Sequence, residues 1–174
     1  MSEIWIVRSN VLAFRPTMDT DLGRVLTMER DQENRQYIRQ WSLEKHQAAI
    51  TDPDIAHFII ETVPEKRMVG YVILIGLENP DQSIEFKRIV IADKGHGHGR
   101  QAVQLIKKYT FEMLNKHRLW LEVMDHNHRA FELYRSVGFI TEGTHREAVK
   151  QGDVYTSLHV MSILAAEYFQ KSMK

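Results

Sequence analysis

The sequence predicts an α+β fold, a single domain in which helices flank a central sheet. In the middle of the chain, segments rich in β-branched and aromatic residues alternate with turn-forming stretches. On both sides of them lie segments whose apolar residues follow helical spacing. The length of 174 residues suits one domain with one sizeable core. We find no internal repeat, low-complexity run or linker, so we expect one domain over residues 1–174.

The N-terminal part predicts a short strand followed by a helix. Residues 11–15 (VLAFR) look extended and end at Pro16. The segment 19–29 (DTDLGRVLTME) opens with acidic side chains, as the positive end of a helix prefers, and then spaces its apolar residues helically. We therefore expect the first helix here.

A polar stretch at residues 30–40 has two interpretations. Such stretches are usually solvated surface. Alternatively, Tyr37 and Trp41 help to form a lid that faces a substrate. Ser42 is then an expected N-cap for a helix in the following residues, LEKHQAAI.

Three segments in the middle of the chain read as strands, and short turn-forming stretches, PEKR and ENPDQ, separate them. The simple interpretation is a pair of consecutive hairpins. The strands are expected at residues 57–62, 68–77 and 84–91.

The C-terminal half predicts a helix of about four turns, a strand, a short helix and two closing strands. Asn127 is the expected cap of the short helix, and Gly138 is expected to end it. The closing strands are expected to flank the turn KQGD. In chain order these elements are the helix at 100–114, the strand at 119–123, the short helix from Asn127 to Gly138, and the strands at 139–145 and 154–164.

Composition excludes several classes of protein. Lys plus Arg equals Asp plus Glu at 23 each, so no overall field attracts nucleic acid or anionic lipid. The chain has no cysteine, which removes disulfides, thiolate metal sites, iron–sulfur clusters and a covalent cysteine intermediate. There is no signal-peptide pattern and no apolar run near the roughly 20 residues that span a bilayer. We expect a soluble, cytoplasmic protein with no nucleic-acid or membrane partner.

A glycine-rich stretch, IADKGHGHGRQAV at residues 91–103, lies between a predicted strand and a predicted helix. Glycines let a ligand approach the backbone, and a helix start offers N–H groups and partial positive charge, so the junction suits a phosphate or pyrophosphate. The stretch matches neither the P-loop nor G-x-G-x-x-G. A plain glycine-rich turn is the alternative.

Two His-x-His pairs raise the question of a metal site. His96 and His98 form one pair, and His126 and His128 form the other. Alternate residues of an extended chain point the same way, so each pair could bind one ion. However, His98 and His128 adjoin helix starts, and nine histidines in the chain make chance pairs common. We expect no metal.

Three segments together resemble the GNAT superfamily of acetyl-CoA-dependent N-acetyltransferases. KGHGHG resembles the family signature [RQ]-x-x-G-x-[GA], with Lys94 at the Arg/Gln position. Residues 119–139 resemble the family's strand followed by N-x-x-A-x-x-L-Y-x-x-x-G-F. The closing hairpin resembles the branch with ribosomal-protein N-terminal and spermidine acetyltransferases. The resemblance implies acetyl-CoA as co-substrate and a largely antiparallel central sheet.

The resemblance also implies a set of cofactor-binding residues. A strand edge would lie beside the pantetheine arm, the glycine loop would cradle the pyrophosphate, and an asparagine would bond the cofactor near its pantetheine. In this sequence the strand edge is Ile89, Val90 and Ile91, the loop is Lys94, Gly95, His96, Gly97, His98, Gly99 and Arg100, and the asparagine is Asn127.

Tyr134 stands at the family's general-acid position, and Glu122 and Glu85 are the two candidates for the base. Each of the three has a purely structural alternative: a packed tyrosine, and glutamates paired with a cation such as Lys87. We expect direct transfer in a ternary complex to a primary amine, which is a peptide N-terminus, a polyamine or another small amine, and a homodimer is compatible with the resemblance. The competing classes are a catalytically silent acetyl-CoA sensor and a His-rich metal-binding module.

Overall fold

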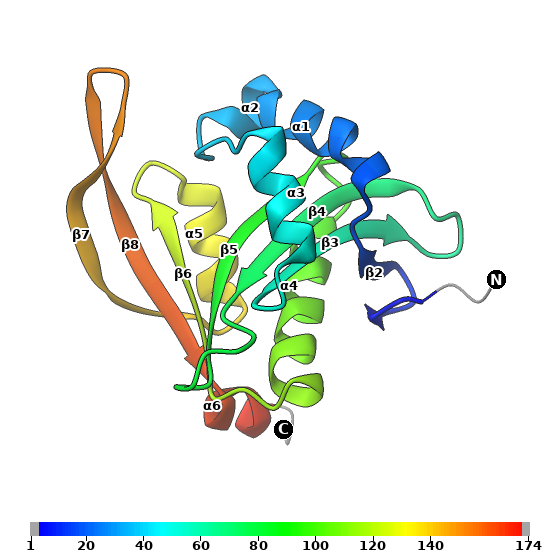
Figure 1. Ribbon diagram of the computed structural model, residues 1–174. Coiled ribbons are helices and arrows are strands. Elements are labelled where there is room, and N and C mark those ends of the chain that lie inside the picture. The colour runs from blue at the N-terminus through cyan, green and yellow to red at the C-terminus, as the bar shows by residue number, and fades with distance from the viewer. Residues whose placement is uncertain (1–3, 172–174) are drawn as a thin grey trace.

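The computed structural model describes residues 4–171 and contains an eight-stranded sheet in the order β1-β2-β3-β4-β5-β6-β8-β7 (Figure 1). All neighbouring strands are antiparallel except β5 and β6, which are parallel. This confirms the predicted α+β class with a largely antiparallel sheet. The strands are β1 (Val7–Arg8), β2 (Leu12–Pro16), β3 (Ile55–Thr62), β4 (Met68–Ile75), β5 (Ser83–Ile91), β6 (Arg118–Met124), β7 (Ile140–Gln151) and β8 (Val154–Leu164).

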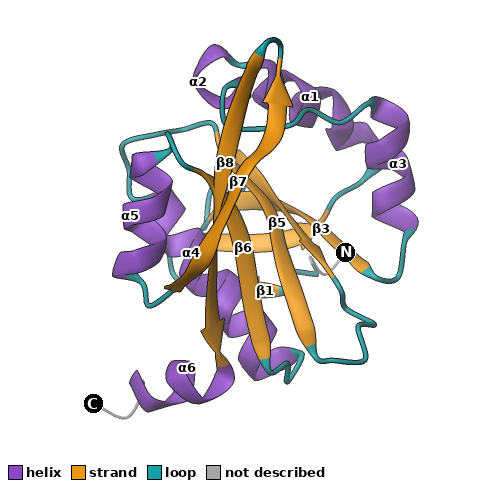
Figure 2. Cartoon of the chain, turned by 90° about the vertical axis from the view of Figure 1, so that its left-hand side faces the viewer, coloured by secondary structure: helices purple, strands orange, loops and turns teal. Residues whose placement is uncertain are grey.

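Helices cover both faces of the sheet, as Figure 2 shows. One core lies under α4 and α5, and a smaller core lies under α1 on the other face. No helix in the described range is both long and apolar enough to cross a bilayer. The helices are the 3₁₀ turn η1 (Asp19–Asp21), α1 (Leu22–Arg30), α2 (Gln32–Arg35), α3 (Leu43–Thr51), α4 (His98–Lys108), the π-helical turn η2 (Tyr109–Met113), α5 (His128–Ser136) and α6 (Ala165–Lys171).

Both predicted N-caps are present. The Ser42 side chain accepts a hydrogen bond from the Lys45 backbone N–H at the start of α3. Asn127 Oδ1 accepts one from the Ala130 backbone N–H at the start of α5. Gly138 follows α5 with a φ of 106°, the left-handed conformation that favours glycine. These local signals position α5 next to the end of β6.

Strand β5 contains a bulge that redirects its side chains. Ile73 of β4 lies opposite Arg88 and Leu74 lies opposite Phe86, so Lys87 is an extra residue without a partner. Such a residue reverses the alternation of faces along the strand. Phe86 therefore packs into the core under α4 and α5, whereas Arg88 points toward α1.

Strands β5 and β6 are paired only at their beginnings. The parallel pairing joins Ser83–Glu85 to Arg118–Trp120 and then stops. Beyond these residues the two strands separate, and that edge of β5 has no strand partner within the described residues. Backbone groups on this edge remain available to a ligand.

Several element boundaries differ from the prediction by a few residues, and the largest difference is at β7. The first closing strand, β7, continues to Gln151 instead of ending at residue 145. Its side chains are almost all exposed, so no alternation of apolar and polar residues signals the extra length, and it is held by pairing with β8. Helix α4 begins at His98, two residues before the predicted start, because the loop itself supplies its first turn.

Candidate active site

Two pockets open where β5 and β6 separate, and they meet. The larger has a volume of about 550 Å³ and the smaller about 420 Å³. We call them the loop pocket and the strand pocket. The residues that line both are Tyr37, Ile38, Ile89, Asn127, Ala130 and Tyr134.

The loop pocket follows the glycine-rich loop and the start of α4. Gly95 and Gly97 have φ values of 84° and 72°, which residues other than glycine rarely adopt. The first N–H groups of α4 have no acceptor inside the helix, and its dipole adds positive charge at this end. This arrangement suits an anionic group such as a pyrophosphate.

Nearly all the predicted cofactor-binding residues line this pocket. They are Ile89, Val90, Ile91, Lys94, Gly95, Gly97, His98, Gly99, Arg100 and Asn127. His96 is the exception: its exposed ring pairs with Asp93 at 3.2 Å and stacks on His98. His98 is buried, and its ring Nδ1 has no hydrogen-bond partner among residues 4–171, so it is free to bond a ligand.

Two cations near the loop already have partners. Lys94 Nζ lies 2.9 Å from Glu33 Oε2, which ties the loop to α2. Arg100 donates to Ser136 Oγ on α5 at 2.9 Å. These two cations are held at the sides of the loop pocket, whereas the exposed Arg129 at the start of α5 also lines it. An anion there would meet the backbone, the helix start and this guanidinium.

Tyr134 lies at the junction of the two pockets. Its ring packs against Phe86 and Phe139, and burial raises the pKa of its hydroxyl. The hydroxyl has no hydrogen-bond partner among the described residues. A packed structural tyrosine normally bonds its hydroxyl nearby, so this group has donor capacity left for a ligand.

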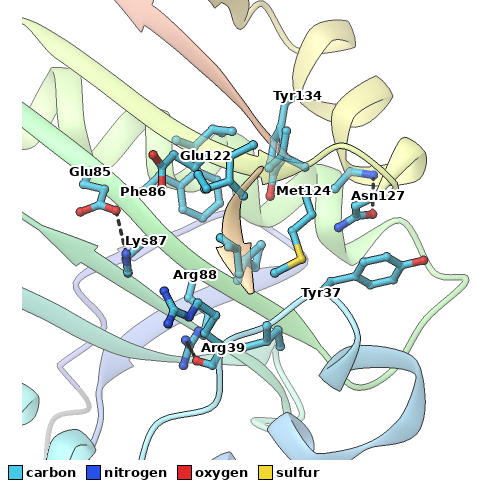
Figure 3. A pocket seen from close by; sticks show the side chains of 18 of the residues that line it. Tyr37, Arg39, Glu85, Phe86, Lys87, Arg88, Glu122, Met124, Asn127 and Tyr134 are labelled. Carbon is cyan, nitrogen blue, oxygen red and sulfur yellow. Dashed lines mark hydrogen bonds and ion pairs between the residues drawn. The ribbon is translucent and has the colours of Figure 1, made fainter. Parts of the chain in front are cut away.

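Glu85 and Glu122 both line the strand pocket (Figure 3), and each has a basic neighbour. Lys87 Nζ lies 3.1 Å from Glu85 Oε1, and His145 Nδ1 lies 3.2 Å from Glu122 Oε1. The two carboxylates are 20% and 28% exposed, so water and a small acceptor both reach them. The geometry leaves both as candidates for the base.

A buried polar network beneath the strand pocket was not predicted. Glu29 is 1% exposed and accepts hydrogen bonds from His46, Tyr71 and Arg88. Burial by itself would raise the pKa of Glu29, but these donors and the charge of Arg88 outweigh it and hold the pKa at about 2. A weak signal existed, because Glu29 stands at helical spacing from Leu22 and Val25 on the buried side of α1.

The two buried histidines of this network form an ordered chain. His46 Nε2 is 3.0 Å from Glu29 Oε1 and so donates to it. His46 Nδ1 is hydrogen-bonded to His57 Nε2 at 3.0 Å, and His57 Nδ1 is hydrogen-bonded to the Thr17 hydroxyl at 2.8 Å. Burial lowers the pKa of His57 to about 3, so this ring is neutral at neutral pH.

The network also supports the segment that covers both pockets. Arg88 donates to the backbone carbonyl of Arg39, and Glu29 Oε2 accepts from the Trp41 backbone N–H at 3.2 Å. Tyr37 lines both pockets, whereas Trp41 lines neither and packs against Arg88 and His46. Of the two aromatic residues considered for a lid, Tyr37 faces the pockets and Trp41 anchors the segment.

The two His-x-His pairs have ordinary surroundings. Within residues 4–171, no three His, Cys, Asp or Glu side chains are arranged to hold a metal ion. His126 lies against the Tyr37 ring and beside Asp125, and His128 is an exposed residue of α5.

Comparisons with known proteins identify the family. A family model for the acetyltransferase (GNAT) domain matches residues 12–140. Spermidine N(1)-acetyltransferase of Vibrio cholerae is 31% identical over 116 residues, which are 66% of each chain. The protein of the same name from Escherichia coli is 29% identical over 138 residues, 74% of this chain and 73% of that one.

A solved structure agrees with this match. Spermidine N-acetyltransferase from Vibrio cholerae in complex with CoA and spermine has a TM-score of 0.83 and 27% identity, covering 92% of this chain and 99% of that chain. Family match and fold point the same way: the chain belongs to the GNAT acetyltransferases, enzymes that use acetyl-CoA as acetyl donor.

Proposed function

We propose that the protein transfers the acetyl group of acetyl-CoA directly to a primary amine, of a small molecule or a peptide, in a ternary complex. The observation that carries this proposal is the meeting of two pockets at Tyr134. Acetyl-CoA would occupy the loop pocket with its pyrophosphate at the start of α4 and its thioester at the junction. The amine would approach through the strand pocket.

The chemistry needs one proton to leave the amine and one to reach the sulfur. The amine nitrogen attacks the thioester carbonyl carbon, an N–C bond forms and the C–S bond breaks. The sulfur departs with the bonding electron pair and takes a proton from the Tyr134 hydroxyl, which water later restores. The amine gives its proton to Glu122 or Glu85, directly or through a water, and the products are the N-acetyl amine and CoA.

Burial suits Tyr134 to this role. A tyrosine hydroxyl is protonated at neutral pH in any case, and burial raises its pKa further. The same removal from water disfavours a free thiolate at the junction, which increases the benefit of protonating the sulfur as it leaves.

Direct transfer is supported by the side chains at hand. The chain has no cysteine, and neither pocket is lined by serine or threonine in the described range. A covalent acetyl-enzyme on a thiol or hydroxyl of those types therefore lacks a nucleophile.

Initial-rate kinetics with acetyl-CoA and a panel of primary amines test the proposal. We expect CoA release that depends on the amine, with double-reciprocal lines that intersect. Labelled CoA should not exchange into acetyl-CoA when amine is absent. Parallel lines with amine-independent exchange would contradict direct transfer, and tight acetyl-CoA binding without turnover of any amine would indicate a sensor.

A further inference from the structure

The charges around the strand pocket bear on which amines it accepts. The described residues that line it include two acids, Glu85 and Glu122, and three permanent cations, Arg39, Lys87 and Arg88. Glu85 is already paired with the permanent cation Lys87 at 3.1 Å, and Glu122 contacts His145 at 3.2 Å. The acidic charge available to a bound cation is therefore smaller than the number of glutamates suggests.

Arg88 does not add net charge to the pocket. Its guanidinium forms an ion pair with Glu29 on the opposite side from the pocket, and both groups are buried. The pair cancels locally, since a buried carboxylate and guanidinium in contact act together as a neutral unit at longer range.

Arg39 is the cation without a counter-charge. Its backbone carbonyl accepts a hydrogen bond from Arg88, and the residue, which is exposed, lines the pocket. Its side chain forms no ion pair with any acid within residues 4–171. Figure 3 places Arg39 on the side of the opening opposite Tyr134 and Glu122.

The pocket therefore has two poles. Glu122 and Tyr134 form one side, next to the cofactor junction, and Arg39 forms the other. A polyamine brings several positive charges and would place one near Arg39 without a compensating acid, which like-charge repulsion disfavours. An amine that also carries an anionic group matches both sides.

We propose that the preferred acceptor is an amphoteric amine, with its amino group at Glu122 and Tyr134 and a carboxylate at Arg39. This inference rests on the proposed function and specifies its substrate class. It separates the protein's specificity from that of the spermidine acetyltransferases it resembles, whose named substrate is a polycation.

The test is a series of acceptors that share one amine and one chain length. Butylamine, 1,4-diaminobutane and 4-aminobutanoate differ only in a neutral, cationic or anionic end, and spermidine extends the cationic arm. We expect kcat/KM for 4-aminobutanoate to exceed that for each polyamine by about 10-fold or more, the size of one charge-assisted contact. We likewise expect kcat/KM for glycine to exceed kcat/KM for glycinamide.

Arg39→Gln should lower kcat/KM for 4-aminobutanoate by about 10-fold, through KM, and leave butylamine within about 2-fold. Arg24→Gln, an exposed residue of α1 outside both pockets, is the matched loss of charge and should change neither acceptor. Arg39→Glu should raise kcat/KM for 1,4-diaminobutane.

The outcomes separate this inference from the proposed function. A wild-type preference for spermidine or 1,4-diaminobutane overturns the amphoteric acceptor while leaving amine acetylation intact. An equal loss on all acceptors in Arg39→Gln also overturns it, because that pattern indicates a structural role. No turnover with any amine, with acetyl-CoA bound, overturns the proposed function itself.

Discussion

Two groups of ionisable side chains flank strand β5, and they differ in how fully their polar atoms are bonded. On the side of α1, Glu29 accepts from three side chains and one backbone N–H, and the histidines beside it complete their own bonds. On the pocket side, Tyr134 has a free hydroxyl, and Glu85 and Glu122 each contact one basic neighbour. Both groups contain acids and bases at short distances.

The difference separates structural from reactive groups. A satisfied buried network fixes its members in one arrangement and has no capacity left for a substrate. A donor that faces a pocket and has no protein partner remains available to water or to a ligand. We therefore assign stability and positioning to the Glu29 network and chemistry to the pocket side, and four experiments test that division.

Tyr134→Phe should have the largest effect and should act on turnover alone. General acid catalysis supplies typically about 10²- to 10⁴-fold, so kcat should fall within that range while acetyl-CoA affinity is kept. The loss should shrink with an acyl donor whose thiol has a lower pKa, because that sulfur needs no proton. Steady-state rates and calorimetry measure the two quantities. Full turnover in the variant would make Tyr134 a packing residue.

Glu29→Gln should destabilise the fold. It leaves the Arg88 charge buried and unpaired, a change that costs about 3–5 kcal/mol of unfolding free energy. Glu132→Gln removes a carboxylate from an exposed ion pair with Arg135 and should cost less than about 1 kcal/mol. Denaturant titration of both variants gives the comparison. Equal stabilities would show that the network does not hold the fold.

The pH dependence of stability should report His57. Its pKa is about 3 in the folded protein and about 6.5 when unfolded, so the unfolded chain binds more protons between these values. The free energy of unfolding should therefore decrease as the pH is lowered, by about 1.5 kcal/mol from pH 6.5 to pH 5. Glu29 stabilises the fold fully above about pH 4.5. It adds to the pH dependence only below that value, where its stabilising charge starts to be lost.

His57→Gln should remove most of this slope between pH 6.5 and pH 5, and His128→Gln, on the exposed side of α5, should keep it. Unfolding curves at several pH values measure the slopes. A slope that survives in His57→Gln would place the titrating group elsewhere.

Glu122→Gln should show the smallest effect on stability. The carboxylate is 28% exposed and its neighbour His145 is 60% exposed, so the pair contributes less than about 1 kcal/mol to the fold. Activity is the informative readout. If Glu122 is the base, the variant should need a higher pH for the same rate, whereas Glu85→Gln should not. Destabilisation as large as that of Glu29→Gln would end the division between the two sides.

The sequence was sufficient for features that local patterns determine. The hairpins of β3, β4 and β5 follow from apolar runs bounded by turn residues, and the N-caps Ser42 and Asn127 follow from residue type next to a helical pattern. The glycine loop and Tyr134 were found because each belongs to a contiguous motif. Local propensity and spacing carry this kind of information.

The Glu29 network was missed because its members are far apart in the chain. Glu29 and Arg88 are separated by 59 residues, and His46 and His57 come from different elements. Each looks like an ordinary surface residue in its own segment. The bulge at Lys87 was also missed, since the strand pattern assumes unbroken alternation, and without it Arg88 would be expected on the same face as Phe86.

The unpaired Lys87 also affects how such an enzyme diversifies. In a regular strand, moving the chain by one residue exchanges every side chain between the two faces. Here the extra residue divides β5 into two blocks, one ending at Phe86 and one beginning at Arg88. The block that contains Glu85 can therefore accumulate substitutions while the inherited Arg88–Glu29 anchor is kept, and loss of the single residue Lys87 would reverse the faces of one block relative to the other.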